Sequence, residues 1–335
     1  MISSLRRAGV EVVERHVGVW ESREHHWRAG AGAAARLALA ELRLMSRPRE
    51  TFDALVVGYP GHLDLPAARR AARGRPVVFN PLVSAHETLV EDRGRFRAGG
   101  LAAGCLAALD RRAFQAADLV VADTAAHAEH LERATGKRPI AVCYVGAEER
   151  FFRPGWQPGA GPFTALFVGK LIPLHGLETI LSAARLAPEL RFRVVGSGQL
   201  GRLLPGAPPN VEHVPWVPYE DLARELHRAS CALGIFGTSD KARRVIPNKA
   251  FQALACGTPL VTADTPAARE LLRDAESALL VPPGEPEALA AALRRLASDA
   301  ALTRRVADGG LAAYRAHASE DVLGARWRGL IEALL

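Results

Sequence analysis

The segment 240–259 (DKARRVIPNKAFQALACGTP) concentrates positive charge, with four basic side chains inside nine residues. We expect a helix to begin at Asn248, whose side chain is a suitable N-cap after the rigid Pro247. Lys249 then falls in the first helical turn, where the helix dipole disfavours a cation. A bound anion would remove that conflict, so the segment predicts an anion site that includes Lys249. A solvated basic loop is the alternative.

The segment 166–177 (LFVGKLIPLHGL) predicts a strand, a short loop and a helix that starts near Gly176. This order gathers backbone N–H groups and the positive end of a helix at one point, which suits a phosphate. Lys170 and His175 flank the loop and are expected to reach the same anion, while Gly169 forms the turn. The alternative is that Lys170 is an ordinary surface charge and Gly169 an ordinary turn residue.

Lysine is rare in this chain. Of its 43 basic residues, 39 are arginine and four are lysine. Lys170, Lys241 and Lys249 fall on the two loops described above, and Lys137 lies elsewhere. This distribution favours the interpretation that both loops face one anionic ligand.

His86 is a further candidate, in the segment 80–92 that follows a predicted strand at 76–79. A histidine at the carboxyl end of a strand can act as a base or donate to a substrate oxygen; a surface histidine is the alternative. The turn 196–198 (GSG) is weak evidence for a site. The remaining histidines that we considered are expected to be exposed and to bind no metal: His25, His26, His127 and His130.

The composition excludes several classes of protein. With 335 residues, 49% hydrophobic and 24% charged, the chain is long enough for two globular domains and is not disordered. No apolar run is long enough for a membrane-spanning helix, and the charged N-terminus predicts no signal peptide. Four widely spaced cysteines predict reduced thiols and a cytoplasmic location. The absence of an Asp-x-Asp motif predicts that no metal and no cofactor is required.

Short apolar runs alternate with longer helical segments, which predicts parallel α/β domains. Strands are expected at 10–13, 54–57, 76–79, 119–122, 140–145, 164–168, 192–195, 211–214, 232–235, 260–262 and 278–281. Helices between them are expected at 33–44, 66–72, 100–117 and 125–134, the last with Thr124 as its N-cap, and in the second half at intervals up to 334.

The expected organisation is two doubly wound domains that face a cleft. The first spans 1–150, a Pro- and Gly-rich linker spans 151–162, the second domain spans 163–318, and a final helix spans 319–335. Because 3–8 reads as the end of a helix and no strand precedes it, we expect the first domain to lack its first strand and turn, about 15–20 residues. An unusual order that begins with a helix is the alternative.

The net charge of +7 is modest, and no recognition motif predicts nucleic-acid binding. Residues 1–155 carry 23 basic and 18 acidic side chains, so most of the excess lies in the first half. Two interpretations stay open: a peripheral contact with an anionic membrane face, or an arginine-rich surface that aids solubility.

The second half resembles the retaining glycosyltransferases of family 4, which have the GT-B fold of two facing Rossmann-like domains. The matching pieces, in order, are FVGKLIPLHGLETIL, RFRVVGSG, VEHVPWVPYEDLARELHRA, NKAFQALACGTPLVTAD, ALLVPPGEPEALAAAL and ARWRGLIEALL. They extend along about 170 residues, and VGAEERFFRP resembles the end of the family's first domain. The rest of the first half is similar only loosely.

The resemblance implies a nucleotide-diphosphate sugar as donor, held by the second domain, and transfer to an acceptor hydroxyl with retention of configuration. Lys170 matches a basic residue that contacts the donor diphosphate, and His175 stands where a second lysine is usual. Val214, Trp216 and Val217 match the strand end that borders the base, and His86 matches a histidine near the transferred sugar. The acceptor (glycan, lipid-linked or small molecule), the sugar and the base are left open. The last helix is expected to cross back to the first domain.

Two positions depart from the family pattern, which has two glutamates eight residues apart. Here they are Arg244 and Gln252. Gln252 can still accept hydrogen bonds from the ribose hydroxyls, whereas Arg244 accepts none and is instead expected to serve the diphosphate with Lys249. These departures keep two alternatives open: a non-catalytic nucleotide-sugar-binding relative or partner subunit, and a sugar-nucleotide epimerase of the same fold.

Overall fold

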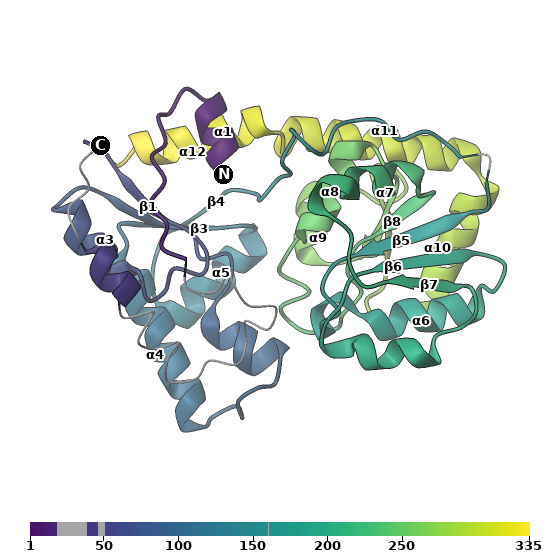
Figure 1. The fold of residues 1–335 in the computed structure, drawn as a ribbon, viewed down its shortest axis with the longest axis horizontal. Coiled ribbons are helices and arrows are strands. Elements are labelled where there is room, and N and C mark those ends of the chain that lie inside the picture. Colours follow the sequence, from purple (N-terminus) through teal and green to yellow (C-terminus); the bar gives the residue numbers. More distant parts are fainter. Residues whose placement is uncertain (19–38, 46–50, 160) are drawn as a thin grey trace.

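Two parallel β-sheets, each covered by helices, make up the computed structural model (Figure 1), which describes residues 1–18, 39–45, 51–159 and 161–335. The first sheet contains β1 (Leu55–Val57), β2 (Val77–Phe79), β3 (Leu119–Ala122) and β4 (Ile140–Val142) in that order. Its strands are almost wholly apolar because both faces are covered. The covering helices include α3 (Leu65–Ala72), α4 (Leu101–Ala116) and α5 (Ala125–Thr135). Thr124 caps α5 by accepting from the His127 amide at 3.0 Å, which confirms the predicted N-cap.

The second sheet has six parallel strands in the order β10-β9-β8-β5-β6-β7. They are β5 (Thr164–Val168), β6 (Arg191–Val195), β7 (Val211–Val214), β8 (Cys231–Leu233), β9 (Leu260–Ala263) and β10 (Leu279–Val281). Its helices are α6 (Leu177–Leu186), α7 (Leu222–Arg228), α8 (Asn248–Cys256), α9 (Pro266–Leu271), α10 (Pro286–Ser298) and α11 (Ala300–His317). The strand order reverses between β5 and β8, and ligands bind α/β sheets at such a reversal, beyond the carboxyl ends of the strands.

The last helix, α12 (Glu320–Glu332), continues α11 across the top of the molecule and ends over the first sheet (Figure 1). There its Leu323 and Trp327 are buried against Val78 and Val121, together with α1 (Ile2–Arg7). Gly324 makes this packing possible, because a β-carbon at this position would lie 2.1 Å from the Ser4 carbonyl oxygen. The two sheets are thus joined by the linker and by this returning helix.

The expected strand at 10–13 is wrong. The chain is extended there but pairs with no strand in the described structure. Val10 and Val12 instead pack in the same cluster as Val56 and Leu119, so their apolar side chains are accounted for by packing on the face of the sheet rather than by pairing at its edge. Of the helix expected at 33–44, only 39–44 lies within the described residues, and these are helical. His25 and His26 lie outside the described residues.

None of the helices in the described ranges combines the length and the apolar composition needed to cross a bilayer.

Candidate functional site

Three predicted residues meet at the carboxyl end of β5. Gly169 follows this strand directly, His175 ends a short helical turn before α6, and Lys249 rises from the first turn of α8. Gly169 has a φ of +146°, and a β-carbon there would lie 2.8 Å from Lys249 Nζ and 3.4 Å from His175 Cε1. Glycine at this position therefore makes room for the lysine, and the two loops singled out in the sequence do face one point.

Lys249 has an unusual environment for a lysine. Only 9% of the residue is exposed, and its Nζ has no hydrogen-bond partner in the described structure. The ammonium lies 3.7 Å from the centroid of the Phe167 ring, which compensates part of its charge. Burial lowers the pKa of Lys249 well below its ordinary value. An unpaired cation of this kind is costly unless an anion binds beside it.

His175 reaches the site as a neutral ring. Its Nδ1 is hydrogen-bonded to the Lys170 carbonyl oxygen, and burial, together with the charge of Lys249, lowers the pKa of His175 to about 2. The Nδ1 proton is used by that carbonyl, so Nε2 carries a lone pair and accepts rather than donates. His175 consequently orients the 169–175 loop and brings no positive charge.

The other residues predicted for the donor site lie around this point. Lys170 and Asn248 are exposed. Asn248 is not the N-cap that the sequence predicts: Pro247 holds that place and Asn248 is the first helical residue. The helix therefore starts at the predicted residue, but no side chain caps its first N–H groups.

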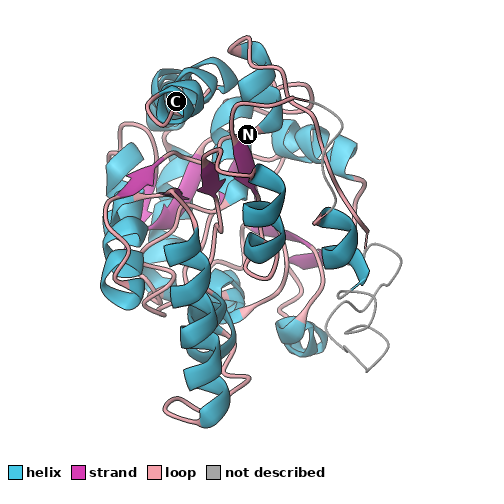
Figure 2. Ribbon diagram, turned by 90° about the vertical axis from the view of Figure 1, so that its left-hand side faces the viewer, coloured by secondary structure: helices cyan, strands magenta, loops and turns pink. Residues whose placement is uncertain are grey.

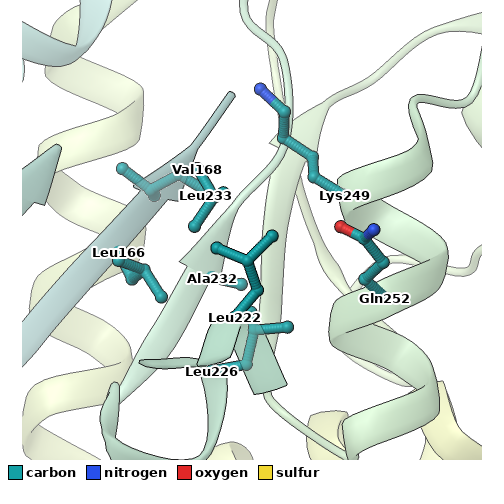
Figure 3. A pocket seen from close by; sticks show the side chains of 8 residues that line it. All are labelled: Leu166, Val168, Leu222, Leu226, Ala232, Leu233, Lys249 and Gln252. Carbon is teal, nitrogen blue, oxygen red and sulfur yellow. The ribbon is translucent and has the colours of Figure 1, made fainter. Parts of the chain in front are cut away.

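Gln252 lies one helical turn after Lys249 and borders a small apolar pocket (Figure 3). Its amide points toward this pocket, while the lysine ammonium extends past the ends of the strands. Gln252 Nε2 donates to the Tyr219 hydroxyl at 3.4 Å. Lys249 also lines the pocket, together with Leu166, Val168, Leu222, Leu226, Ala232 and Leu233. At the end of β7, Val214 and Val217 are half-buried and Trp216 is 73% exposed.

Arg244 points away from this group and toward the first domain. Its Nη2 lies 2.7 Å from Glu87 Oε1 and 3.3 Å from Glu91 Oε2. Lys241 Nζ donates to Thr88 Oγ1 at 2.7 Å. Both basic side chains therefore bridge the two domains in this structure, and the expectation that Arg244 serves the diphosphate with Lys249 finds no contact here.

Glu87 is the centre of this bridge and was missed by reasoning from sequence. Its carboxylate is fully buried, with His127 Nε2 at 3.4 Å and His130 Nε2 at 3.8 Å. His127 also lies 2.6 Å from Asp123 Oδ1 and is fully buried, so the prediction that it is exposed is wrong; it occupies the inner face of α5. In the sequence, only the position of Glu87 next to His86 pointed to a role for this carboxylate. The spacing of His127 and His130 did not indicate that they share a carboxylate partner.

The charges of this cluster shift one another's pKa values. Burial alone would raise the pKa of Glu87, but His127, Lys241 and Arg244 lower it to about 2. Burial alone would lower the pKa of His127, but Asp123 and Glu87 raise it to about 9. Glu87 and His127 are therefore both ionised across the neutral range.

Glu87, Glu91 and His130 also satisfy the geometric requirement for a metal site, but the Arg244 guanidinium contacts both carboxylates and would repel a metal ion there. This donor set fits a metal ion poorly.

A second interdomain contact lies beside the first. The carboxylate of Glu270, in α9, accepts from the amides of Ala125 and Ala126 at 2.8 and 2.9 Å. A carboxylate at a helix N-terminus satisfies free N–H groups and the positive helix end. The first turn of α5 is thus bound to the second domain.

His86 is held by its backbone. Asp110, buried in α4, accepts from the amides of Ala85 and His86 at 2.9 and 3.0 Å and from Ser84 Oγ at 2.6 Å. The imidazole itself is partly exposed, with Nδ1 3.4 Å from Glu91 Oε1. His86 is therefore linked through Glu91 to Arg244, whereas Lys249, His175 and Gly169 form a separate group.

We expect stability to depend on pH through His127 and Glu87. The raised pKa of His127 stabilises the fold below pH 6.5, and this contribution is lost as the pH rises through 9. The lowered pKa of Glu87 stabilises the fold above pH 4.5, and this contribution is lost as the pH falls toward 2. The free energy of urea unfolding should therefore be highest near pH 4.5–6.5 and fall by roughly 3 kcal/mol on either side. Glu87→Gln should flatten the profile; an unchanged profile would contradict the assignment.

Comparison with known proteins adds a family to this geometry. Residues 162–299 match the family described as Glycosyl transferases group 1. A D-inositol 3-phosphate glycosyltransferase of Streptomyces bingchenggensis is 30% identical over 226 residues, which are 58% of this chain and 48% of the relative. A phosphatidyl-myo-inositol mannosyltransferase of Mycobacterium leprae is 33% identical over 162 residues, 45% of this chain and 42% of the relative. The chain spans about half the length of the curated relatives it matches.

Solved structures agree on the fold. Sucrose-phosphate synthase from Thermosynechococcus elongatus superposes with a TM-score of 0.73 at 18% identity, over 90% of this chain and 78% of the other. Anabaena Alr3699/HepE in complex with UDP-glucose gives a TM-score of 0.68 at 17% identity, over 89% and 82% of the two chains. At such low identity these likenesses concern the fold alone.

Proposed function

This chain is a glycosyltransferase family 4-like protein with the GT-B fold, and from that premise we propose that it transfers a sugar from a nucleotide-diphosphate donor to an acceptor hydroxyl, with retention and without a metal. The observation that carries the proposal is the unpaired, buried ammonium of Lys249 beside Gly169, at the carboxyl end of β5. A donor diphosphate is the anion that this position would accept, and a neighbour of the same fold holds UDP-glucose.

The remaining residues give the donor an orientation. The N-terminus of α6 and Lys170 would add positive potential around the diphosphate. Gln252 would accept from the ribose hydroxyls, and the half-buried end of β7 at Val214 and Val217 would border the base. His86 would approach the sugar from the first domain.

In the proposed reaction, the bond between the anomeric carbon and the diphosphate oxygen breaks, and its electron pair stays on that oxygen. The acceptor oxygen forms the new bond on the same face, and its proton passes to the departing diphosphate, so configuration is retained. Negative charge grows on the leaving group in this step. A preorganised cation such as Lys249 stabilises that charge most in the transition state.

A non-catalytic binder is the second candidate, because Arg244 stands where the resemblance expects a sugar-contacting glutamate and is paired with Glu87. Transfer assays that follow the anomeric configuration of the product by NMR separate the two functions. For either function we also propose a cytoplasmic location with contact at the inner membrane face, and for the transferase an acceptor hydroxyl on a glycan, a lipid-linked molecule or a small molecule.

Donor binding should be visible as thermal stabilisation. A nucleotide-diphosphate sugar at 100 times its dissociation constant should stabilise the protein by about 2.7 kcal/mol. The shift should persist in EDTA, because the proposed site uses cations of the chain itself. A panel of nucleotide sugars, with the corresponding nucleosides as controls, identifies the base and sugar. A shift that disappears in EDTA would contradict metal independence, and a panel without any shift would contradict the donor site.

A further inference from the structure

The first domain projects a tip at the start of α4. The helix and the loop before it extend below the rest of the molecule in both views (Figures 1 and 2). Residues 94–99 are all exposed. Leu101, the first residue of the helix, is 94% exposed, and Phe96 is 41% exposed. Leu101 therefore buries almost no apolar area within its own domain.

The beginning of α4 is apolar although it is outside the core. Residues 101–109 (LAAGCLAAL) contain no charged side chain. Leu101, Ala102, Gly104 and Cys105 are exposed, whereas Ala113 and Phe114 at the other end are buried in the first-domain core. The second half of the helix supplies the residues of that core, and in the first turn Ala103 is the buried one. Contiguous exposed apolar surface of this kind indicates a binding surface.

The charge around this apolar surface is of one sign. Arg93, Arg95 and Arg97 precede the helix, and no acidic residue occurs between 93 and 109. A segment that combines exposed leucine and phenylalanine with arginines suits the interface of an anionic bilayer, where apolar side chains enter the headgroup region and cations face phosphates. A symmetric contact with a second copy would instead place the arginines of the two copies near each other.

We propose that the α4 tip, defined as residues 93–105, docks the protein on a membrane surface that contains anionic lipids. This goes beyond the proposed transfer reaction, since it requires neither donor nor acceptor. It also specifies which surface carries the basic excess of the first half of the chain. Exposed Leu101 and Phe96 supply apolar area, and the exposed side chains of Arg95 and Arg97 supply the preference for anionic lipid.

The same helix connects the tip to the candidate site. Asp110, which holds the His86 segment, is nine residues after Leu101, about 14 Å along the helix axis. If the proposed function is correct, docking through the tip would bring His86 close to the headgroup region, where a lipid-linked acceptor would present its hydroxyl. This consequence rests on the proposed function, whereas docking itself does not.

Cys105 provides a direct test, because it is exposed on the tip while the other three cysteines are buried. An environment-sensitive fluorophore attached to Cys105 should shift to the blue and brighten with vesicles that contain 30% phosphatidylglycerol. It should respond little to pure phosphatidylcholine, and the response should weaken with salt. Donor binding, measured separately by thermal shift, keeps a failure of docking distinct from a failure of the proposed function.

Variants locate the contact. Arg95→Glu/Arg97→Glu should weaken vesicle partitioning at least ~20-fold, since each basic residue near the surface contributes about fivefold. Leu101→Ser should weaken it roughly tenfold. The matched control, Arg202→Glu/Arg295→Glu on exposed positions of the second domain, makes the same change in net charge and should partition like the parent.

Three results would overturn the proposal: no response to anionic vesicles, an equal loss in the control variant, or a spectral change that depends on protein concentration without vesicles. The last would show that a second copy covers the tip.

Discussion

Lys249→Met is expected to lower the turnover of sugar transfer by roughly 10²–10³-fold, the usual effect of removing one preorganised group that stabilises a leaving charge. The same substitution should raise the stability of the ligand-free protein by about 1–2 kcal/mol. The parent buries an ammonium with no hydrogen-bond partner in the described structure, and methionine fills similar space without a charge. Loss of activity together with a gain in stability is the signature of a binding group rather than a structural one.

The stability difference between the parent and Lys249→Met should depend on pH, and the direction follows from the pKa of Lys249. Because burial lowers the pKa of Lys249, the unfolded chain binds its proton more tightly than the folded one. The destabilising contribution of Lys249 should therefore shrink as the pH rises toward the ordinary lysine pKa, so that the stability gap between the parent and Lys249→Met closes. A bound diphosphate would favour the protonated lysine, so calorimetry in buffers of different ionisation enthalpy, below the ordinary lysine pKa, should detect proton uptake on binding.

Lys137→Met is the matched control, since Lys137 Nζ donates to the Ala117 carbonyl in the first domain at 2.7 Å. Its turnover should equal that of the parent. Unchanged turnover in Lys249→Met would show that the diphosphate binds elsewhere. A less stable Lys249→Met would show that the lysine has a structural role.

Glu87→Gln is expected to lower the free energy of unfolding by about 3 kcal/mol. The substitution keeps the shape of the side chain but leaves Arg244, Lys241 and His127 without their shared carboxylate in a buried environment. Breaking one partner of a buried ion pair typically costs 3–5 kcal/mol, because the other charge is left uncompensated. Urea unfolding at pH 6, where Glu87 and His127 are both ionised, measures the loss.

Two further variants make this result specific. Glu332→Gln removes an exposed pair with Arg328 (2.7 Å) and should cost less than about 0.5 kcal/mol. Replacing both partners, as in Glu87→Met/Arg244→Met, should recover part of the loss, since Arg244 then leaves no unpaired charge, whereas His127 and Lys241 still lack the carboxylate. If Glu87→Gln costs no more than Glu332→Gln, the interdomain cluster contributes little to the fold.

Much of this fold follows from patterns that are local in the chain. Short apolar runs that alternate with helical segments predicted the strands β1–β10 within one or two residues at their starts, because a strand covered on both faces needs continuous apolar residues. The turn at Gly169 and the place of Lys249 in the first turn of α8 could also be predicted, since turn conformation and helix starts depend on residues that are near in the chain. The prediction of a strand at 10–13 failed because apolar residues indicate packing against other apolar groups but do not indicate whether the backbone pairs with a neighbouring strand.

The sequence by itself therefore determined the α/β class, the two-sheet organisation and the convergence of Lys249 with the 166–177 loop. Only the tertiary structure decided the partners of Arg244 and His127 and the exposure of the α4 tip. Arg244 and Glu87 are 157 residues apart, and their pairing depends on how two domains dock. A buried charge takes whatever partner the packing brings within reach, and no pattern of neighbouring residues encodes that distance.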